Sequence, residues 1–549
     1  MTTPLSTQPS MWQRSTIRRF LKWLFCWRTV RRALIGMACL ITLAALFCAE
    51  ENIRGKQTWE NYRREAEARG KQFDLAALIP KPIPDEQNFA ATPFIKSWFV
   101  RSNRTYVAAE YWNFDNDGRV SSMVSSSRDK KDEGNRHFTD LVAWEMALDA
   151  LRSGELDPRA VPAHHPRPRE EKTFESDKRD LASRAKAAPA VLDSLKTNEA
   201  VFAELRAASQ RPLSRYPLEY DLNNPFAILL PHLSPVRSVC RRLGLKACAE
   251  LAADRSPEAL GDVKLALFMA DSLKEEPFLI SCLVRVACWQ SATQPVWEGL
   301  AEHAWSDAKL QELEARLQQC DFVSDAKKSL ESERACGVTT MELVRKKGPA
   351  YLFDISGDAS PTLADDRRSA NFIGLFIPRG WYYLEEYNYC RLFDTLLGSG
   401  LDTAKKRVSP GQLAAGQREL SQELSGGGVK AILHHRIMAA MLLPALERFV
   451  VKAAQAQTTA NQAAVACALE RYRLANGQFP DTLDALVPRF ISPLPHDVIT
   501  GEPYKYRRTA DGQFVLYSIG WNEKDDGGIP GSKLFDETEG DWVWQYASQ

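Results

Sequence analysis

The sequence predicts a mainly α protein that has a single N-terminal transmembrane helix, an irregular helical body and a C-terminal α+β module with a small antiparallel sheet. Three observations predict this class. The segment Ala33–Ala49 carries no charge, apolar residues recur at helical spacing through most of 139–345, and short alternating segments around a glycine turn follow a long helical segment near the C-terminus. A solenoid is one alternative for the body.

Length and composition limit the class of protein. A chain of 549 residues is expected to hold several domains, because a single core stops growing at about 250–300 residues. Apolar residues make up 44% and charged residues 26%, a balance typical of folded globular proteins. The formal net charge of +1 gives no electrostatic argument for binding nucleic acid.

The first 32 residues form a basic head that contains no acidic residue, and Ala33–Ala49 follows it as a predicted membrane span. At ~1.5 Å per residue this span is about 25 Å long, which is the low end for a membrane helix. Positive charge beside a span favours the cytoplasmic side, so we expect a cytoplasmic N-terminus with the bulk of the chain across the membrane. The basic residues are Arg14, Arg18, Arg19, Lys22, Arg28, Arg31 and Arg32.

Two other interpretations of the span are a cleaved signal peptide and a lipoprotein. A signal peptidase site needs small residues, and Phe47 and Cys48 fit that pattern poorly. A lipidated cysteine normally follows a smaller residue than Phe47. The sequence therefore favours an uncleaved anchor.

Residues 50–138 are predicted to hold a charged, solvated juxtamembrane helix, a proline-rich linker at Leu78–Phe89 and a small irregular region. The helical body follows at 139–430, where short polar breaks separate helical segments. No fixed repeat period aligns across it, so we describe it as irregular. Within the body, Phe376–Phe393 is so rich in aromatic residues that they cannot share one helix face. They predict either a buried wedge between helices or a partner-binding patch.

Eight cysteines lie beyond the span, without the spacing of a zinc site. Most fall within apolar helical patterns, which predicts small buried side chains. Disulfides are the alternative if the body is periplasmic. These residues are Cys240, Cys248, Cys282, Cys288, Cys320, Cys336, Cys390 and Cys467.

The C-terminal module spans 431–549 and begins with a long helix. Val465, Leu469 and Tyr472 form a stripe at helical spacing that should face the following sheet. Asn476-Gly477 predicts the helix end, because both residues tolerate the left-handed conformation of a helix cap.

The second half of the module is predicted to form a short helix and a small sheet. Asp481 should cap the short helix, whose Leu483, Leu486 and Val487 should point inward. Two alternating segments around Ala510-Asp511-Gly512 predict a hairpin, and Asp541–Tyr546 should return as a third strand.

The stretch from Ala460 to Trp544 resembles the C-terminal half of the major pseudopilins of type II secretion systems. The resemblance lies in a long helix ending in "YRLANG", then "QFPDTLDALVPRF", "PLPHD" and "PYKY", and finally a hairpin with "SIGWN" and an acidic loop. It implies a fold for this module and a bacterial inner-membrane protein with a periplasmic body. The processed leader of true pseudopilins is absent, and the predicted span lies far upstream, so the fold would serve for contacts rather than for pilus-like assembly in the usual way.

A calcium site is predicted in the acidic loop that follows the hairpin. Calcium takes six to eight oxygen ligands from a turning loop, and Asn522, Asp525 and Asp526 supply oxygens before Gly527-Gly528. In the major pseudopilins the equivalent loop binds calcium. By position the resemblance implies the ligands Ser518, Asn522, Asp525, Asp526 and Asp541. A solvated acidic turn is the alternative, since Asn522 stands where an aspartate is usual and a longer insert precedes Asp541.

The sequence contains no recognised catalytic motif, including HExxH, GxSxG and the Walker A loop. We therefore expect a membrane-anchored envelope protein with a structural or protein-interaction role, linked through the resemblance to secretion or pilus-like assembly. The alternatives are an extracytoplasmic enzyme with dispersed catalytic residues and a sensor or binding protein. The expected partners are the membrane, through Ala33–Ala49, and other envelope proteins.

Overall fold

The structure is a computed structural model that describes residues 26–102, 105–106, 134–153, 181–351, 372, 374, 377–398, 400–426, 430–431 and 433–546. Most of the basic head lies outside the described residues, as does most of the irregular region between the linker and the body. The described part is mainly helical, with small antiparallel sheets, which confirms the coarse fold class.

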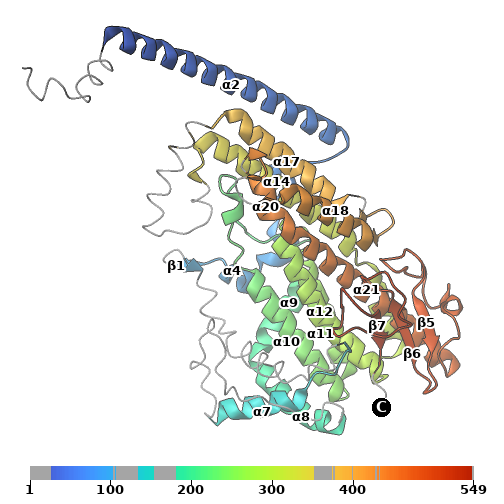
Figure 1. Cartoon of the computed structure of the whole chain (residues 1–549). Helices are drawn as coiled ribbons and strands as arrows, with labels where there is room; N and C mark the ends of the chain where they lie inside the picture. Colours follow the sequence, from blue (N-terminus) through green and yellow to red (C-terminus); the bar gives the residue numbers. More distant parts are fainter. Residues whose placement is uncertain are drawn as a thin grey trace, which may run out of the picture. The chain divides into compact units, whose positions relative to one another are not determined.

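The described elements form a long series of helices, with short strand pairs after α4 and after α17, that ends in a small sheet (Figure 1). The α-helices are α2 (Trp27–Ala68), α3 (Leu75–Leu78), α4 (Pro93–Ser97), α7 (Leu141–Arg152), α8 (Leu181–Leu195), α9 (Glu199–Ala208), α10 (Leu233–Ala252), α11 (Ser256–Asp271), α12 (Leu279–Ala301), α13 (Asp307–Gln318), α14 (Phe322–Lys347), α17 (Arg379–Leu397), α18 (Pro410–Leu424), α20 (Ile437–Leu442) and α21 (Leu446–Asn476). The strands are β1 (Arg101–Ser102), β2 (Thr105–Tyr106), β3 (Leu401–Asp402), β4 (Arg407–Val408), β5 (Lys505–Arg508), β6 (Phe514–Ser518) and β7 (Trp542–Gln545).

The chain divides into two compact units. Unit 1 contains residues 1–70 and 341–388, so its described part consists of α2, the last turns of α14, the first half of α17 and short described segments between these last two helices. Unit 2 contains residues 71–340 and 389–549.

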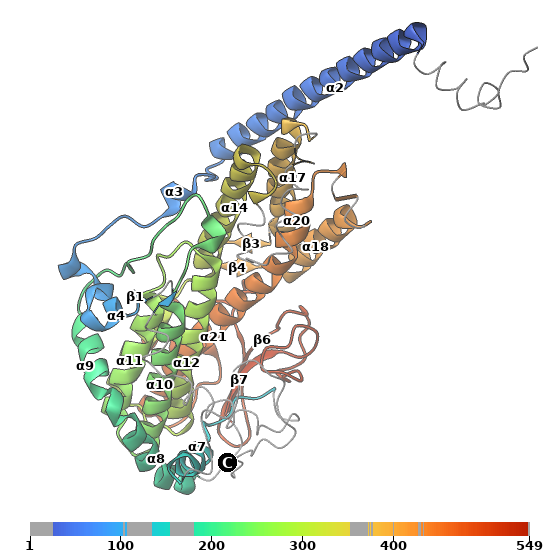
Figure 2. The same ribbon diagram turned by 90° about the vertical axis from the view of Figure 1, so that its left-hand side faces the viewer.

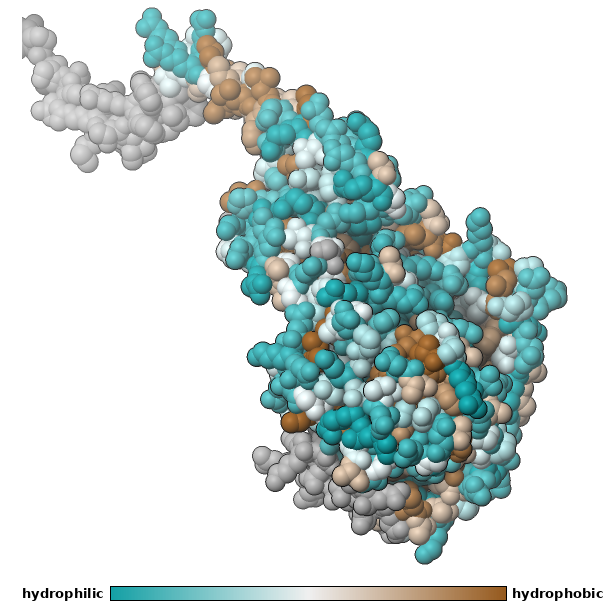
Figure 3. Space-filling view, turned by 90° about the vertical axis from the view of Figure 1, so that its right-hand side faces the viewer, coloured by the Kyte–Doolittle hydropathy of each residue, from teal (hydrophilic) through white to brown (hydrophobic). Residues whose placement is uncertain are grey.

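Helix α2 changes character along its length. Its apolar half is exposed, and a window of it is long and apolar enough to cross a membrane while having no buried residue. Figure 3 shows the apolar side chains gathered on this half of the helix. The exposed large apolar residues before position 50 are Trp27, Leu34, Ile35, Met37, Leu40, Ile41, Leu43, Leu46 and Phe47. The structure therefore confirms one candidate N-terminal membrane helix.

The second half of α2 packs within unit 1, which corrects the prediction of a solvated juxtamembrane helix. Glu51, Gly55, Trp59 and Ala66 are buried. The backbones approach closely at Gly55, where an added Cβ would lie 2.2 Å from the carbonyl oxygen of Gly380. The many charged residues of this segment therefore predicted a solvated helix, although small and aromatic residues on one narrow face make contacts.

The core of unit 2 is a bundle in which α10, α11 and α12 lie side by side (Figures 1 and 2). Helix α21 packs against α12 and α13, and one apolar cluster holds residues from α10 to α13, α21 and the C-terminal sheet. The resembling stretch is therefore built into the same core as the helical body.

The C-terminal sheet has the order β5-β6-β7 and is antiparallel throughout. Leu516 pairs with Tyr506 on one side and with Trp544 on the other. The predicted hairpin and third strand are thus confirmed. The end of α21 is also as predicted, since Gly477 adopts φ 80° and its N–H donates to the carbonyl oxygen of Arg473.

Two predicted details of the short helix after α21 are wrong. The segment is a single 3-10 turn, Leu483–Leu486, and Thr482 occupies the cap position without a side-chain hydrogen bond. The Asp481 carboxylate accepts instead from Arg508 at 2.9 Å. Leu483 and Leu486 are buried as predicted, but Val487 is 43% exposed because the turn ends before it.

The aromatic run of α17 is used for contacts within unit 1, as the wedge interpretation predicts. The rings of Tyr62 and Tyr387 pack edge to face with their centroids 5.5 Å apart. The guanidinium group of Arg345 lies over the ring of Tyr383. All eight cysteines beyond the span are buried free thiols, which agrees with their prediction as small buried side chains.

Candidate functional site

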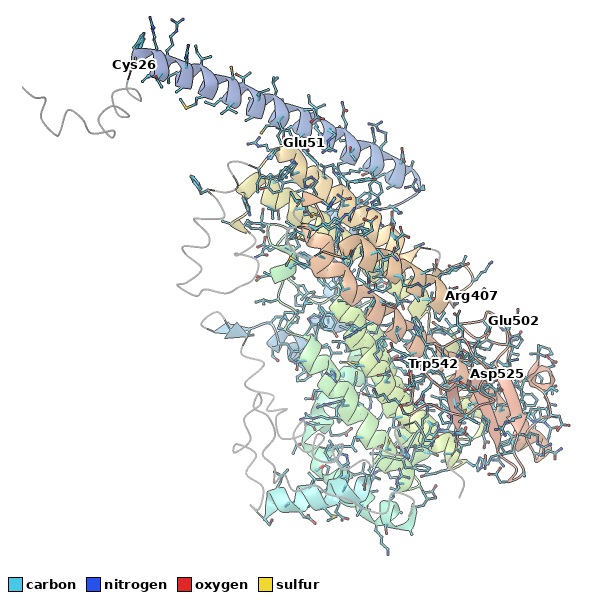
Figure 4. All side chains as sticks on the ribbon, in the orientation of Figure 1. Cys26, Glu51, Arg407, Glu502, Asp525 and Trp542 are labelled. Atoms are coloured by element: carbon cyan, nitrogen blue, oxygen red, sulfur yellow. The ribbon has the colours of Figure 1, made fainter. Side chains whose placement is uncertain are left out.

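The candidate site is the acidic loop, residues 519–541, which connects β6 to β7. Figure 4 shows Asp525 and Trp542 in the region of the C-terminal sheet. The loop leaves β6 at Ser518, and Trp542 begins β7. Because β6 and β7 pair directly, both ends of the loop are fixed by strand hydrogen bonds.

Asp541 closes the loop through its carboxylate. Its Oδ1 accepts from the backbone N–H of Asp526 at 3.2 Å, and its Oδ2 accepts from that of Gly528 at 2.6 Å. Burial raises the pKa of Asp541, the two amide hydrogen bonds oppose this, and the charges of Asp525 and Asp526 raise the pKa further. The structure therefore places Asp541 beside the acidic cluster, as the sequence predicted.

The other predicted ligands form hydrogen bonds with different partners. Asn522 donates from Nδ2 to Asp526 Oδ2 at 3.2 Å. Asp525 Oδ1 accepts from the Tyr517 hydroxyl at 3.1 Å and from the Gly527 N–H at 3.0 Å. Ser518 donates to Asp497, which lies between the 3-10 turn Leu483–Leu486 and β5, at 2.8 Å. Four of the five predicted residues thus share one loop, and Ser518 belongs to a different hydrogen-bonded pair.

This arrangement fits calcium only in part. Among the described residues, no group of three or more His, Cys, Asp or Glu side chains is placed to hold a metal ion. The amide N–H groups of Asp526 and Gly528 point at the Asp541 oxygens, and a cation there would face the positive ends of these dipoles. Calcium would require Asp541 to exchange these bonds, so the calcium site stays a prediction.

Two aspartates that the sequence did not single out accept hydrogen bonds in the loop and beside it: Asp536 lies within the loop and Asp497 lies outside it. Asp497 is buried and accepts from the N–H of Ile499 as well as from Ser518. Burial raises the pKa of Asp536, but hydrogen bonds led by those from Thr538 outweigh it and lower the pKa to about 2. The signal for Asp536 was the pattern Asp-x-Thr, in which the carboxylate can accept from residues just after it.

Buried charges outside the loop pair one helix with another. Lys246 lies between two buried acids, 2.7 Å from Glu250 Oε1 and 2.6 Å from Asp262 Oδ2. Burial, and then the charge of Asp262, raises the pKa of Glu250 to about 7 in spite of Lys246. These groups join α10 to α11. No spacing in the sequence predicts the pair between Lys246 and Asp262, because its two residues come from different helices.

In unit 1, Glu386 is a buried acid on α17. Burial raises its pKa to about 8, although Arg345 lies 3.9 Å away and acts in the opposite direction. Glu386 faces Arg345 and Glu342 of α14 and Arg63 of α2, so it belongs to the contact between these helices.

No known protein family, curated protein or solved structure matches this chain.

Proposed function

We propose that this protein is a single-pass membrane-anchored envelope protein with a structural or protein-interaction role. One observation carries the proposal: a single unbroken helix, α2, joins an exposed apolar half to a half that packs in a folded unit. An anchor built this way holds unit 1 directly at the membrane surface.

The exposed half of α2 is too apolar to face water. Burial of apolar surface contributes about 25 cal/mol per Å², so the run of exposed Leu, Ile, Met and Phe side chains gains stability from a lipid environment. A helix of a soluble core would be covered by the protein, and this one is not. Its position near the N-terminus also suits a signal sequence, so the experiment must separate an anchor from a cleaved segment.

The buried charges support a structural role for the body. Arg184 pairs with Glu298 at 2.5 Å and also with Glu302, and Arg471 pairs with Glu314 at 2.9 Å. Each pair joins one helix to another helix or to the residue that caps it. In each pair the charges neutralise one another within the protein, so these groups are not available to react with a substrate. This favours a scaffold over the enzyme alternative.

The link to secretion or pilus-like assembly rests on the resemblance of Ala460–Trp544. The long helix, the hairpin and the returning strand agree with the fold that the resemblance implies. Partners would then be other envelope proteins, and the body would lie on the periplasmic side of a bacterial inner membrane.

Topology fusions test the proposal. Alkaline phosphatase and a fluorescent protein are each fused to the C-terminus of the full chain, and the N-terminus of the membrane fraction is sequenced. We expect active phosphatase, a dark fluorescent fusion and an N-terminus that still precedes Ala33. A bright fluorescent fusion would overturn the topology, and an N-terminus after Cys48 would overturn the anchor.

A further inference from the structure

We propose that the end of unit 1 next to the apolar half of α2 binds the anionic lipid headgroups of the same bilayer, through Lys346, Lys347 and Arg379. The inference rests on the proposed anchor and adds a second, charge-dependent membrane contact to it.

The N-terminus of α17 is bonded to α2 just beyond the uncharged stretch. The Gly380 N–H donates to Asn52 Oδ1 at 2.7 Å, and Trp381 Nε1 donates to Glu51 at 3.0 Å. Glu51 follows the uncharged stretch by two residues, which is about 3 Å along a helix. The start of α17 therefore lies at the level where α2 leaves the apolar layer. Figure 4 labels Glu51 on the part of α2 that faces α17.

The contacts of α14 with α2 and α17 define its direction. Arg63 of α2 lies 3.7 Å from Glu342 of α14, well beyond the membrane boundary. Further along α14, Leu343 and Val344 pack with Tyr382 in the first turn of α17. Helix α14 thus runs back toward the membrane, and Figure 2 shows its end beside α2.

Exposed positive charge lies at the end of α14 and at the start of α17. The last turn of α14 holds Arg345, Lys346 and Lys347, and the side chain of Lys346 is 62% exposed. Lys347 and Arg379 are also exposed. Lys346 lies 3.8 Å from Glu342, an exposed contact of the kind that contributes little and can yield to a phosphate. Headgroup layers are several Å thick on each side of the hydrocarbon, so long basic side chains at this level reach them.

An exposed apolar residue lies near the same basic turn. Phe372 is 63% exposed, and Gly374, two residues on, is so close to Pro349 that an added Cβ would lie 2.6 Å from its Cδ. Pro349 comes two residues after Lys347, the last residue of α14. An exposed aromatic ring beside exposed cations is the pattern of a membrane interface, because the ring enters the headgroup region and the cations bind phosphate.

The test uses the full chain in bilayer nanodiscs, with a photoreactive phenylalanine analogue placed at Phe372. The discs contain zwitterionic lipid with or without anionic phosphatidylglycerol, and the lipid crosslink is measured by mass spectrometry. Leu40 in the apolar half of α2 is the positive control position, and Leu229, which is 54% exposed in unit 2, is the negative one.

We expect lipid crosslinks at Phe372 that increase with the anionic lipid. The triple variant Lys346→Gln, Lys347→Gln and Arg379→Gln should lower the preference for anionic lipid by roughly fivefold per charge. The matched variant Lys186→Gln, Lys274→Gln and Lys405→Gln removes three exposed cations of unit 2 and should leave the preference unchanged.

The outcomes separate the two proposals. Crosslinks that fail at Leu40 as well as at Phe372 would overturn the anchor. Crosslinks at Leu40 without any at Phe372 would overturn this inference and leave the anchor standing. A Phe372 crosslink with equal yield in both lipids, unchanged in the triple variant, would also overturn the headgroup contact.

Discussion

Two long helices of this protein, α2 and α21, have opposite environments in spite of their sequences. The apolar half of α2 is exposed throughout, although it contains the most hydrophobic stretch of the chain. Helix α21 carries many Gln, Thr and Arg residues, yet almost every residue from 449 to 471 is buried. Hydrophobicity alone therefore does not decide which helix forms the core.

The two helices differ in the groups that surround them. Several polar groups of α21 have fixed partners: Gln457 Oε1 accepts from the N–H of Phe322 at 2.7 Å, and Gln462 Nε2 donates to the carbonyl oxygen of Trp542 at 2.7 Å. Its many alanines let neighbouring elements approach closely. Buried polar groups that are satisfied in this way cost little and fix the register of α21 against its neighbours.

The largest expected effect concerns the buried stripe of α21. Leu469 is fully buried, so Leu469→Ala should lower the free energy of unfolding by about 2–5 kcal/mol, through lost burial and the cavity left behind. Chemical denaturation measures this. Leu474→Ala on the same helix, at a position 45% exposed, is the control and should change stability by less than about 0.5 kcal/mol. Equal effects of both variants would show that the stripe is not the packing seam.

The second prediction concerns the exposed half of α2. Leu40→Arg places a charge at the centre of the span and should cost about 2.5–3.5 kcal/mol of membrane insertion. The measurement is the fraction of protein that resists alkaline carbonate extraction. Leu40→Ala keeps the span uncharged and should stay in the membrane. If the arginine variant also resists extraction fully, α2 is held by something other than lipid.

The third prediction concerns the point where α2 passes from exposed to packed. Gly55→Ala forces a Cβ against the backbone of Gly380 and should destabilise the contact by about 1–3 kcal/mol, against a helix-propensity gain of about 1 kcal/mol. Hydrogen exchange of the backbone amides at 55–68 should become faster. Gly261→Ala in α11, where an added Cβ meets nothing within 4 Å, should leave exchange unchanged.

The fourth prediction is a pH dependence of the same unit. The pKa of Glu386 is raised to about 8 by burial, above its ordinary value near 4.5, so the folded state binds its proton more tightly. Its contribution to stability is complete below about pH 4.5 and is lost as pH rises through about 8. Glu386→Gln should therefore remove part of the loss of stability between these values, measured by thermal unfolding at several pH values. A pH profile identical to that of the wild type would show that Glu386 is not the titrating group.

The smallest expected effect is a change in thermal stability caused by calcium at the acidic loop, residues 519–541 of the C-terminal module. If calcium displaces the bonds of Asp541, it should raise the melting temperature of the full chain slightly, magnesium should do so less, and a chelator should reverse the gain. Asp525→Asn and Asp526→Asn should remove the calcium-specific part. Equal melting curves with calcium and with chelator would identify the loop as a hydrogen-bonded acidic turn.

Local signals predicted much of the fold because they act over a few residues. The uncharged Ala33–Ala49, the cap at Gly477 and the hairpin around Asp511 all depend on near neighbours, and all appear in the structure. The Asp481 cap was wrong because Arg508, distant in sequence, binds that carboxylate. Ser518 likewise pairs with Asp497 instead of joining the predicted calcium ligands.

By itself, then, the sequence determined the helical class, the apolar segment of α2 and the strand pattern of the last residues, since periodicity and charge are properties of the chain. Only the tertiary structure decided that the juxtamembrane half of α2 packs through Gly55 and that α21 lies in the main core. It also decided that Asp541 closes the loop onto two amides. The physical reason is that close backbone approach and hydrogen-bond partners depend on residues far apart in sequence, which no local pattern records.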